Sequence, residues 1–174
     1  MTLNLDPPSP DLLLTFCYKA EVEAVWRELA TPAGVRHDWS KFCEVSEVVD
    51  GVSSFRFPGV GFFAEMRILR RDPPFLLEWE CCEATHQSTG AIRELEEWTG
   101  SRIRFELSRL EEGGCRLAFT HAGLEAMECG VLCAAGWRML LDDTLRATVE
   151  GAGAGPGLTE PGAGGGPGQW VQAA

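Results

Sequence analysis

The chain has 174 residues, of which 45% are hydrophobic and 24% charged, and its formal net charge is −11. This length suits one domain with a substantial core and is too short for two domains of typical size. The negative charge repels phosphate backbones, which argues against nucleic-acid binding, and no apolar run is long enough to cross a bilayer, so we expect no membrane insertion.

The first 31 residues predict a leader, a strand and a helix. Residues 1–11 are polar and proline-rich, and we expect them to form a leader outside the domain. They lack the positive start and apolar middle of an export signal, so we expect a cytoplasmic protein. Residues 12–18 are expected to form a strand. Helical spacing then predicts a helix through Val22, Val25, Trp26 and Leu29.

A second short helix and a series of strands are expected next. Thr31-Pro32 ends the first helix and begins the second. Glycine and proline then separate four expected strands, which cover residues 43–49, 53–57, 62–70 and 75–81. Residues 82–100 mix polar residues with apolar residues at rough helical spacing, and we expect either a short helix or a flap there.

The region from Ser101 to Val149 carries the clearest pattern. Residues 101–110 and 115–121 each alternate between apolar and polar residues, and the Glu-Glu-Gly-Gly turn between them predicts an antiparallel hairpin. An amphipathic helix centred on Gly136-Trp137 follows. After residue 150, half of the remaining residues are glycine or proline, so we expect residues 151–174 to form a disordered tail.

These elements predict an α+β protein. A curved antiparallel sheet of six to seven strands wraps around a long C-terminal helix, and two short helices follow the first strand. The domain is expected to cover residues 12–150.

Several local sequences resemble a known family. They are residues 20–26 (AEVEAVW), Trp39, residues 74–79 (PFLLEW), residues 120–124 (THAGL) and residues 136–141 (GWRMLL). Together with the element order, they resemble the helix-grip fold of the START-like (SRPBCC) superfamily, and within it the homologues of the activator of heat-shock-protein-90 ATPase. The resemblance implies a cavity between the sheet and the last helix that holds an apolar molecule.

The resemblance leads us to expect a binding protein for a small hydrophobic or aromatic ligand. The side chains expected to contact this ligand are Trp39, Phe63 (with Phe62 as the alternative at this point of the strand), Trp79, Phe105, Leu117, Phe119, His121, Trp137 and Leu141. Tryptophan is favoured because it offers a large apolar face and one N–H donor. The alternative is that the same side chains fill a packed core.

His121 leaves a second function class open. It continues the apolar row of its strand, where it could act as a general base or anchor a ligand, or simply hydrogen-bond within the fold. A cyclase, dehydratase or hydrolase would use it in the same cavity. His37-Asp38 could bring an imidazole and a carboxylate to the entrance. A co-chaperone-like adaptor, suggested by the family name, is the third class.

The seven cysteines do not form a disulfide framework or a zinc knuckle, because their number is odd and no Cys-x-x-Cys spacing occurs. Cys129 and Cys133 lie one helical turn apart and could hold a metal with a histidine, but small buried hydrophobic residues explain them as well. We therefore expect no metal and no cofactor. The expected partner is a small apolar molecule, and a homodimer is possible.

Overall fold

The computed structural model describes residues 10–87 and 90–151. Most of the predicted leader and nearly all of the predicted tail therefore lie outside the described residues. The elements follow the expected order, and their bounds are β1 (Leu12–Tyr18), α1 (Val22–Ala30), α2 (Pro32–Asp38), β2 (Phe42–Glu44), β3 (Val52–Phe57), β4 (Phe62–Asp72), β5 (Leu76–His86), β6 (Arg102–Arg109), β7 (Cys115–His121), α3 (Gly130–Arg138) and α4 (Leu145–Val149).

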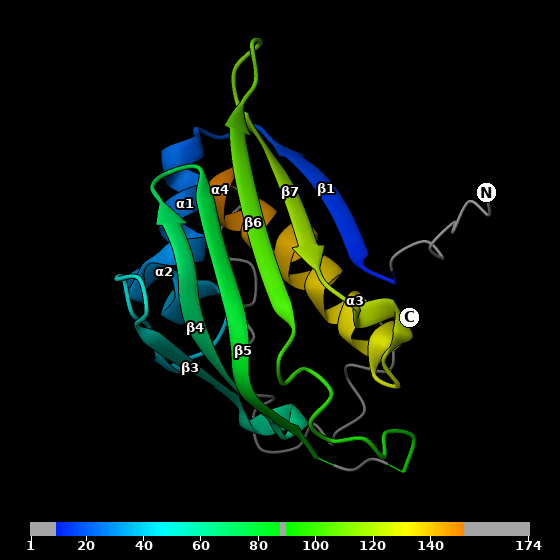
Figure 1. Cartoon of the computed structure of the whole chain (residues 1–174). Helices are drawn as coiled ribbons and strands as arrows, with labels where there is room; N and C mark the ends of the chain where they lie inside the picture. Colours follow the sequence, from blue (N-terminus) through cyan, green and yellow to red (C-terminus); the bar gives the residue numbers. More distant parts are fainter. Residues whose placement is uncertain (1–9, 88–89, 152–174) are drawn as a thin grey trace, which may run out of the picture.

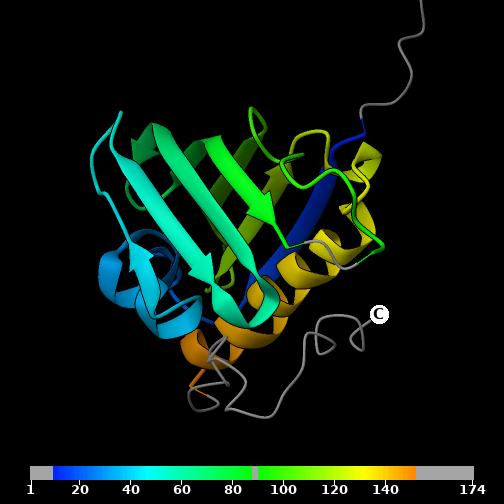
Figure 2. The same cartoon turned by 90° about the horizontal axis from the view of Figure 1, so that it is seen from below.

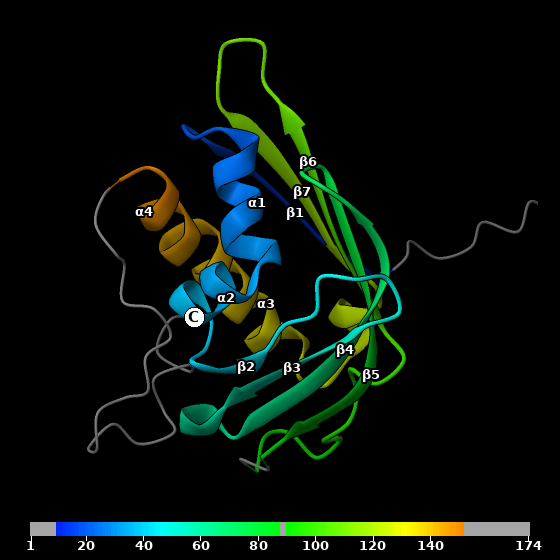
Figure 3. The same cartoon turned by 90° about the vertical axis from the view of Figure 1, so that its left-hand side faces the viewer.

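One antiparallel sheet of seven strands organises the protein. Its strand order is β1-β7-β6-β5-β4-β3-β2, which confirms the expected sheet. Figures 2 and 3 show that the sheet curves and that α1, α2, α3 and α4 all lie on its concave side. Among the described residues, the helices therefore cover one face of the sheet, as the alternation of apolar and polar residues in the strands predicts.

The two short helices pack closely against each other. Thr31 caps α2 by accepting a hydrogen bond from the backbone N–H of Gly34, and Pro32 occupies the first turn. A Cβ atom at position 34 would overlap the carbonyl oxygen of Arg27. The glycine therefore permits the close approach of α1 and α2.

Two strand predictions differ from the structure. The strand expected at residues 43–49 is only three residues long, because residues 45–51 turn before β3. In contrast, β5 continues to His86, so the helix considered for residues 82–100 was wrong, and residues 90–100 form bends and turns. The alternation is hard to recognise there because the pairing of β4 with β5 shifts register twice.

The terminal helix is continuous but not uniformly α-helical. Between α3 and α4, the segment η3 (Met139–Thr144) is a π-helix. The buried hydroxyl of Tyr18, at the end of β1, donates a 2.7 Å hydrogen bond to the carbonyl oxygen of Leu141 within this segment. A wide π turn frees carbonyl groups from the usual α-helical partners, and Tyr18 pairs with one of them. Figure 1 shows the terminal helix crossing behind β6 and β7.

The N-terminal end of the described domain is held by hydrogen bonds to the segment that follows β7. Pro10 and Asp11, which fall in the predicted leader, accept hydrogen bonds from the backbone N–H groups of Glu125 and Gly123, respectively. Within the described residues, the helices are all too short or too polar to cross a membrane.

Candidate functional site

Six aromatic side chains meet between the inner face of the sheet and the terminal helix. We call them the aromatic cluster: Trp39, Phe55, Trp79, Phe105, Phe119 and Trp137. Trp39 is central, since its ring centroid lies 5.9 Å from that of Trp79, 6.0 Å from that of Phe105 and 5.8 Å from that of Trp137. These separations are contact distances for aromatic pairs, so the rings pack against one another.

Most of the predicted site residues come together on this side of the sheet. All except Phe63 are buried, and the eight are Trp39, Trp79, Phe105, Leu117, Phe119, His121, Trp137 and Leu141. Their packing fits the core that the sequence left as an alternative. Whether they also contact a ligand stays a prediction.

Phe63 is placed differently from the sequence prediction. It pairs with Arg56 across β3 and β4, and the Arg56 guanidinium lies 4.8 Å above its ring. The neighbouring Phe62 faces the interior instead, where its ring lies 4.8 Å from that of Trp98. A strand alternates its faces at every residue, so β4 directs Phe63 to the outer face.

His121 is completely buried, and both of its ring nitrogens have partners. The indole Nε1–H of Trp137 donates to Nδ1 over 3.1 Å, and Nε2 lies 3.1 Å from the hydroxyl of Ser101. That hydroxyl donates its own proton to the carbonyl oxygen of Trp98, so it accepts from the imidazole. The imidazole is therefore neutral with its proton on Nε2.

The protonation of His121 agrees with these partners. Burial lowers the pKa of His121 to about 4, and the negative charge of Asp11 opposes this shift only in part. The ring therefore stays neutral near pH 7. The lone pair on Nδ1 already accepts a hydrogen bond from Trp137. His121 is therefore poorly placed to act as a general base.

Two buried indole N–H donors of the aromatic cluster lack a hydrogen-bond partner among the described residues. The indole N–H groups of Trp39 and Trp79 are inaccessible to solvent, and no hydrogen-bond acceptor for them lies within the described ranges. Trp79 and Trp39 meet edge to face, with their planes at 75°. An indole edge directed at a ring face compensates only weakly for a missing acceptor.

His37 and Asp38 lie in contact at the end of α2. Nδ1 of His37 lies 2.8 Å from the Asp38 carboxylate, which also accepts a 2.8 Å hydrogen bond from the Thr148 hydroxyl. Asp38 is buried, and burial raises its pKa. The carboxylate thus joins α2 to α4.

Comparison with known proteins decides the fold. No protein-family model matches the sequence, and no curated protein matches it. Among solved structures, the Aha1 dimer from Colwellia psychrerythraea has a TM-score of 0.65 and 23% identity, over 82% of this chain and 98% of that one. The chain has the helix-grip fold.

Two further solved structures share this helix-grip arrangement. CalU16 from Micromonospora echinospora has a TM-score of 0.55 and 23% identity, over 76% of this chain and 71% of that one. DynU16, a protein in the dynemicin biosynthetic locus, has a TM-score of 0.62 and 16% identity, over 83% of this chain and 49% of that one. These likenesses confirm the fold that the sequence resemblance implies.

Some residues of the helix-grip interior were missed by sequence reasoning. Phe55 belongs to a short strand without clear alternation, yet it contacts Trp39 and Trp79. Trp98 lies in the irregular segment before β6, and its ring stacks on that of Trp137 at 5.8 Å with an angle of 11° between the planes. Only its residue type, a tryptophan among polar neighbours, was a signal for burial.

Two groups in the described part of the helix-grip domain bring three potential metal ligands within 4.8 Å of one another. One consists of Glu28, His37 and Asp38, where both partners of the Asp38 carboxylate lie at Oδ1 and its Oδ2 has no hydrogen-bond partner in the described ranges. The other consists of His86, Cys129 and Cys133. His86 comes from the end of β5, which sequence reasoning did not single out.

Proposed function

We propose that the protein binds a small, apolar, aromatic-sized molecule that carries one hydrogen-bond acceptor, between the inner face of the sheet and the terminal helix. The ligand lies against Trp39 and Trp79, and its acceptor atom accepts a hydrogen bond from the indole N–H of one of them. The other predicted residues of the aromatic cluster and the neighbouring Leu117 and Leu141 supply the apolar surroundings.

The observation that carries this proposal is the pair of buried indole N–H groups without an acceptor. Leaving a buried donor unpaired costs about 1 to 3 kcal/mol, whereas the N–H of Trp137 in the same region has a partner in His121. Two such donors on neighbouring rings, whose centroids lie 5.9 Å apart, favour a bound acceptor such as a ketone or an ether. A ligand of this kind enters by moving the ring of Trp39, which joins the cluster from the end of α2 rather than from the sheet.

The related folds support a small-molecule role. DynU16 lies in a biosynthetic locus, and both it and CalU16 share the helix-grip arrangement at low sequence identity. Binding is favoured over the cyclase, dehydratase or hydrolase alternative because the lone pair of His121 is already occupied. Cytoplasmic location and homodimer formation stay predictions; the Colwellia Aha1 structure is that of a dimer, which supports the second.

Titration with two matched probes tests the proposal. 2-Acetonaphthone carries a carbonyl acceptor, and 2-ethylnaphthalene has nearly the same shape without one. We expect saturable binding of both by calorimetry, with the ketone bound more tightly by about 1 to 2 kcal/mol, which is roughly 5- to 30-fold.

Tryptophan variants identify the donor. Trp39→Phe or Trp79→Phe should remove the preference for the ketone and retain the binding of 2-ethylnaphthalene. The matched control is Trp26→Phe, because Trp26 is buried in α1 beneath the guanidinium of Arg71 and outside the aromatic cluster. If neither probe shows saturable binding, the proposal is wrong. If the two probes bind with equal affinity, the indole donors do not take part in binding.

A further inference from the structure

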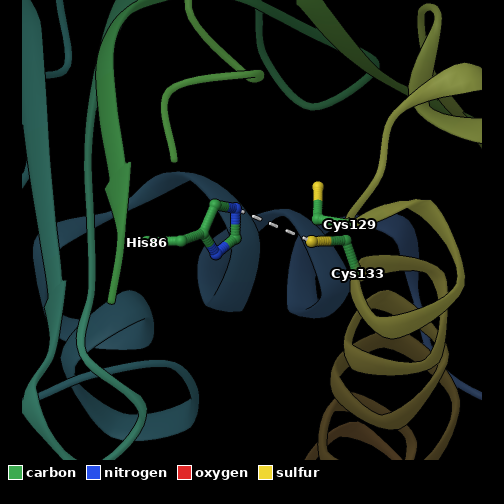
Figure 4. Close-up of side chains that lie close together, drawn as sticks. All are labelled: His86, Cys129 and Cys133. Carbon is green, nitrogen blue, oxygen red and sulfur yellow. Dashed lines mark hydrogen bonds between the residues drawn. The ribbon is translucent and has the colours of Figure 1, made fainter. Parts of the chain in front are cut away.

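Three side chains with metal-binding chemistry meet where the end of β5 approaches the start of α3. His86 is the last residue of β5, Cys129 precedes the first residue of α3, and Cys133 follows one turn later. Figure 4 shows the imidazole facing the two cysteines, with the sulfur of Cys133 directed at the ring. The His86 Nε2 and Cys133 Sγ atoms are 4.0 Å apart.

The separations of these atoms suit a tetrahedral ion. One ligand atom from each of His86, Cys129 and Cys133 lies within 4.8 Å of the other two. Zinc bonds of about 2.3 Å to sulfur and 2.0 Å to nitrogen place tetrahedral ligand atoms about 3.6 to 3.8 Å apart. The group therefore needs to contract by only about 1 Å or less around an ion.

We propose that His86, Cys129 and Cys133 bind a zinc ion, with the fourth tetrahedral position open to an exchangeable ligand. Two thiolates and a neutral imidazole are ligands that zinc prefers, whereas magnesium and calcium prefer oxygen. Cys133 is only partly buried, so solvent reaches the group from its side. The sequence expectation of no metal is revised here because the fold brings His86 to the two cysteines.

Charge balance suits the buried location. Each thiol releases its proton on binding, so that two thiolates neutralise the double positive charge of zinc and no net charge is buried.

The surroundings hold the three side chains in place before any ion binds. The Glu97 carboxylate accepts hydrogen bonds from the backbone N–H groups of Glu128 and Cys129 at the start of α3. The Glu128 carboxylate accepts from the N–H groups of Arg93 and Glu94 in return. This reciprocal pairing fastens the segment before β6 to the helix, and such support is what a pre-organised metal site requires.

The His86 ring is fixed as well. Its backbone N–H donates a 2.8 Å hydrogen bond to the carbonyl oxygen of Leu95. The ring of Phe62 lies 4.6 Å from the imidazole, and the ring of Trp98 lies 6.2 Å from it. These aromatic neighbours limit the rotation of the imidazole, so Nε2 faces the sulfurs.

Metal titration of the full-length protein, first reduced and stripped with a chelator, tests the proposal. We expect one Zn²⁺ per chain in competition with a chromogenic chelator. Co²⁺ in the same site should give the intense visible bands of tetrahedral cobalt and a thiolate-to-cobalt charge-transfer band. Absence of 1:1 binding, or a spectrum of octahedral cobalt without thiolate ligation, would overturn the proposal.

Single substitutions locate the ion. Cys133→Ser and His86→Gln should each weaken zinc binding by about 100-fold and change the cobalt spectrum. The matched control is Cys82→Ser, which removes an exposed thiol outside the group and should leave affinity and spectrum unchanged. Cys129→Ser adds a third test, and circular dichroism checks that each variant is folded. If the control weakens binding as much as Cys133→Ser does, the ion is bound elsewhere and the proposal is wrong.

Discussion

Trp137 of the terminal helix donates a 3.1 Å hydrogen bond from its indole Nε1 to Nδ1 of His121, at the end of β7. Both residues are buried, and Ser101 occupies the other nitrogen of the imidazole. The helix is thus joined to the sheet by a polar contact within an aromatic interior. His121 thus anchors the terminal helix to the sheet, and both of its ring nitrogens already have hydrogen-bond partners.

A double-mutant cycle measures this contact. Trp137→Phe leaves Nδ1 of His121 buried without a donor, whereas His121→Leu removes the acceptor. The double variant lacks both the indole N–H donor and the imidazole acceptor, so this contact leaves no polar group without a partner. We expect the free energies of unfolding in urea to be non-additive by about 1 to 2 kcal/mol. Strict additivity would mean that the hydrogen bond does not stabilise the fold.

The buried imidazole predicts a dependence of stability on pH. The pKa of His121 is about 4 in the folded state and 6.5 in the unfolded chain. The unfolded state therefore binds the proton first, and the free energy of unfolding falls as the pH drops from 6.5 to 4. The contribution is complete above pH 6.5 and amounts to about 3 kcal/mol.

Urea unfolding at several pH values checks this dependence. His121→Asn, which cannot take up the proton, should reduce the loss of stability between pH 6.5 and 4. Val131→Ala serves as the control, because Val131 is exposed and carries no titratable group. If His121→Asn shows the same pH dependence as the unaltered protein, His121 is not the group responsible.

Tyr18→Phe tests the contact between β1 and the π-helical segment. The substitution leaves the carbonyl oxygen of Leu141 without the Tyr18 hydroxyl, and we expect a loss of about 1 to 2 kcal/mol in the free energy of unfolding. Amide hydrogen exchange within residues 139–145 should become faster. Unchanged stability and exchange would show that the π turn forms without the tyrosine.

The sequence predicts the sheet and helices well because their information is local. Alternation in residues 101–110 and 115–121 identifies β6 and β7, which pair with each other, and Glu78 lies opposite Arg104 across β5 and β6. Their carboxylate and guanidinium lie 3.5 Å apart. In contrast, Glu80 pairs with Arg67 rather than Arg102, because β4 also borders β5.

The features that sequence reasoning misses depend on distant contacts. The π turn contacts Tyr18, which is 123 residues away from Leu141 and donates a hydrogen bond to its carbonyl oxygen. Sequence reasoning left Phe63 and Phe62 open as the inward residue of β4, because an uncertainty of one residue at the start of a strand reverses its faces. His86 approaches Cys129 because β5 continues to His86, beyond residue 81, where the expected strand ends.

The most direct test of the proposed function is the indole region of the ¹H–¹⁵N spectrum. The chain has six tryptophans, and single Trp→Phe variants assign their N–H signals. On addition of 2-acetonaphthone, we predict a saturable shift of the Trp39 or Trp79 signal to lower field, with the Trp26 signal unchanged. If neither signal of the pair responds at concentrations that saturate calorimetric binding, the ligand does not lie between the sheet and the terminal helix.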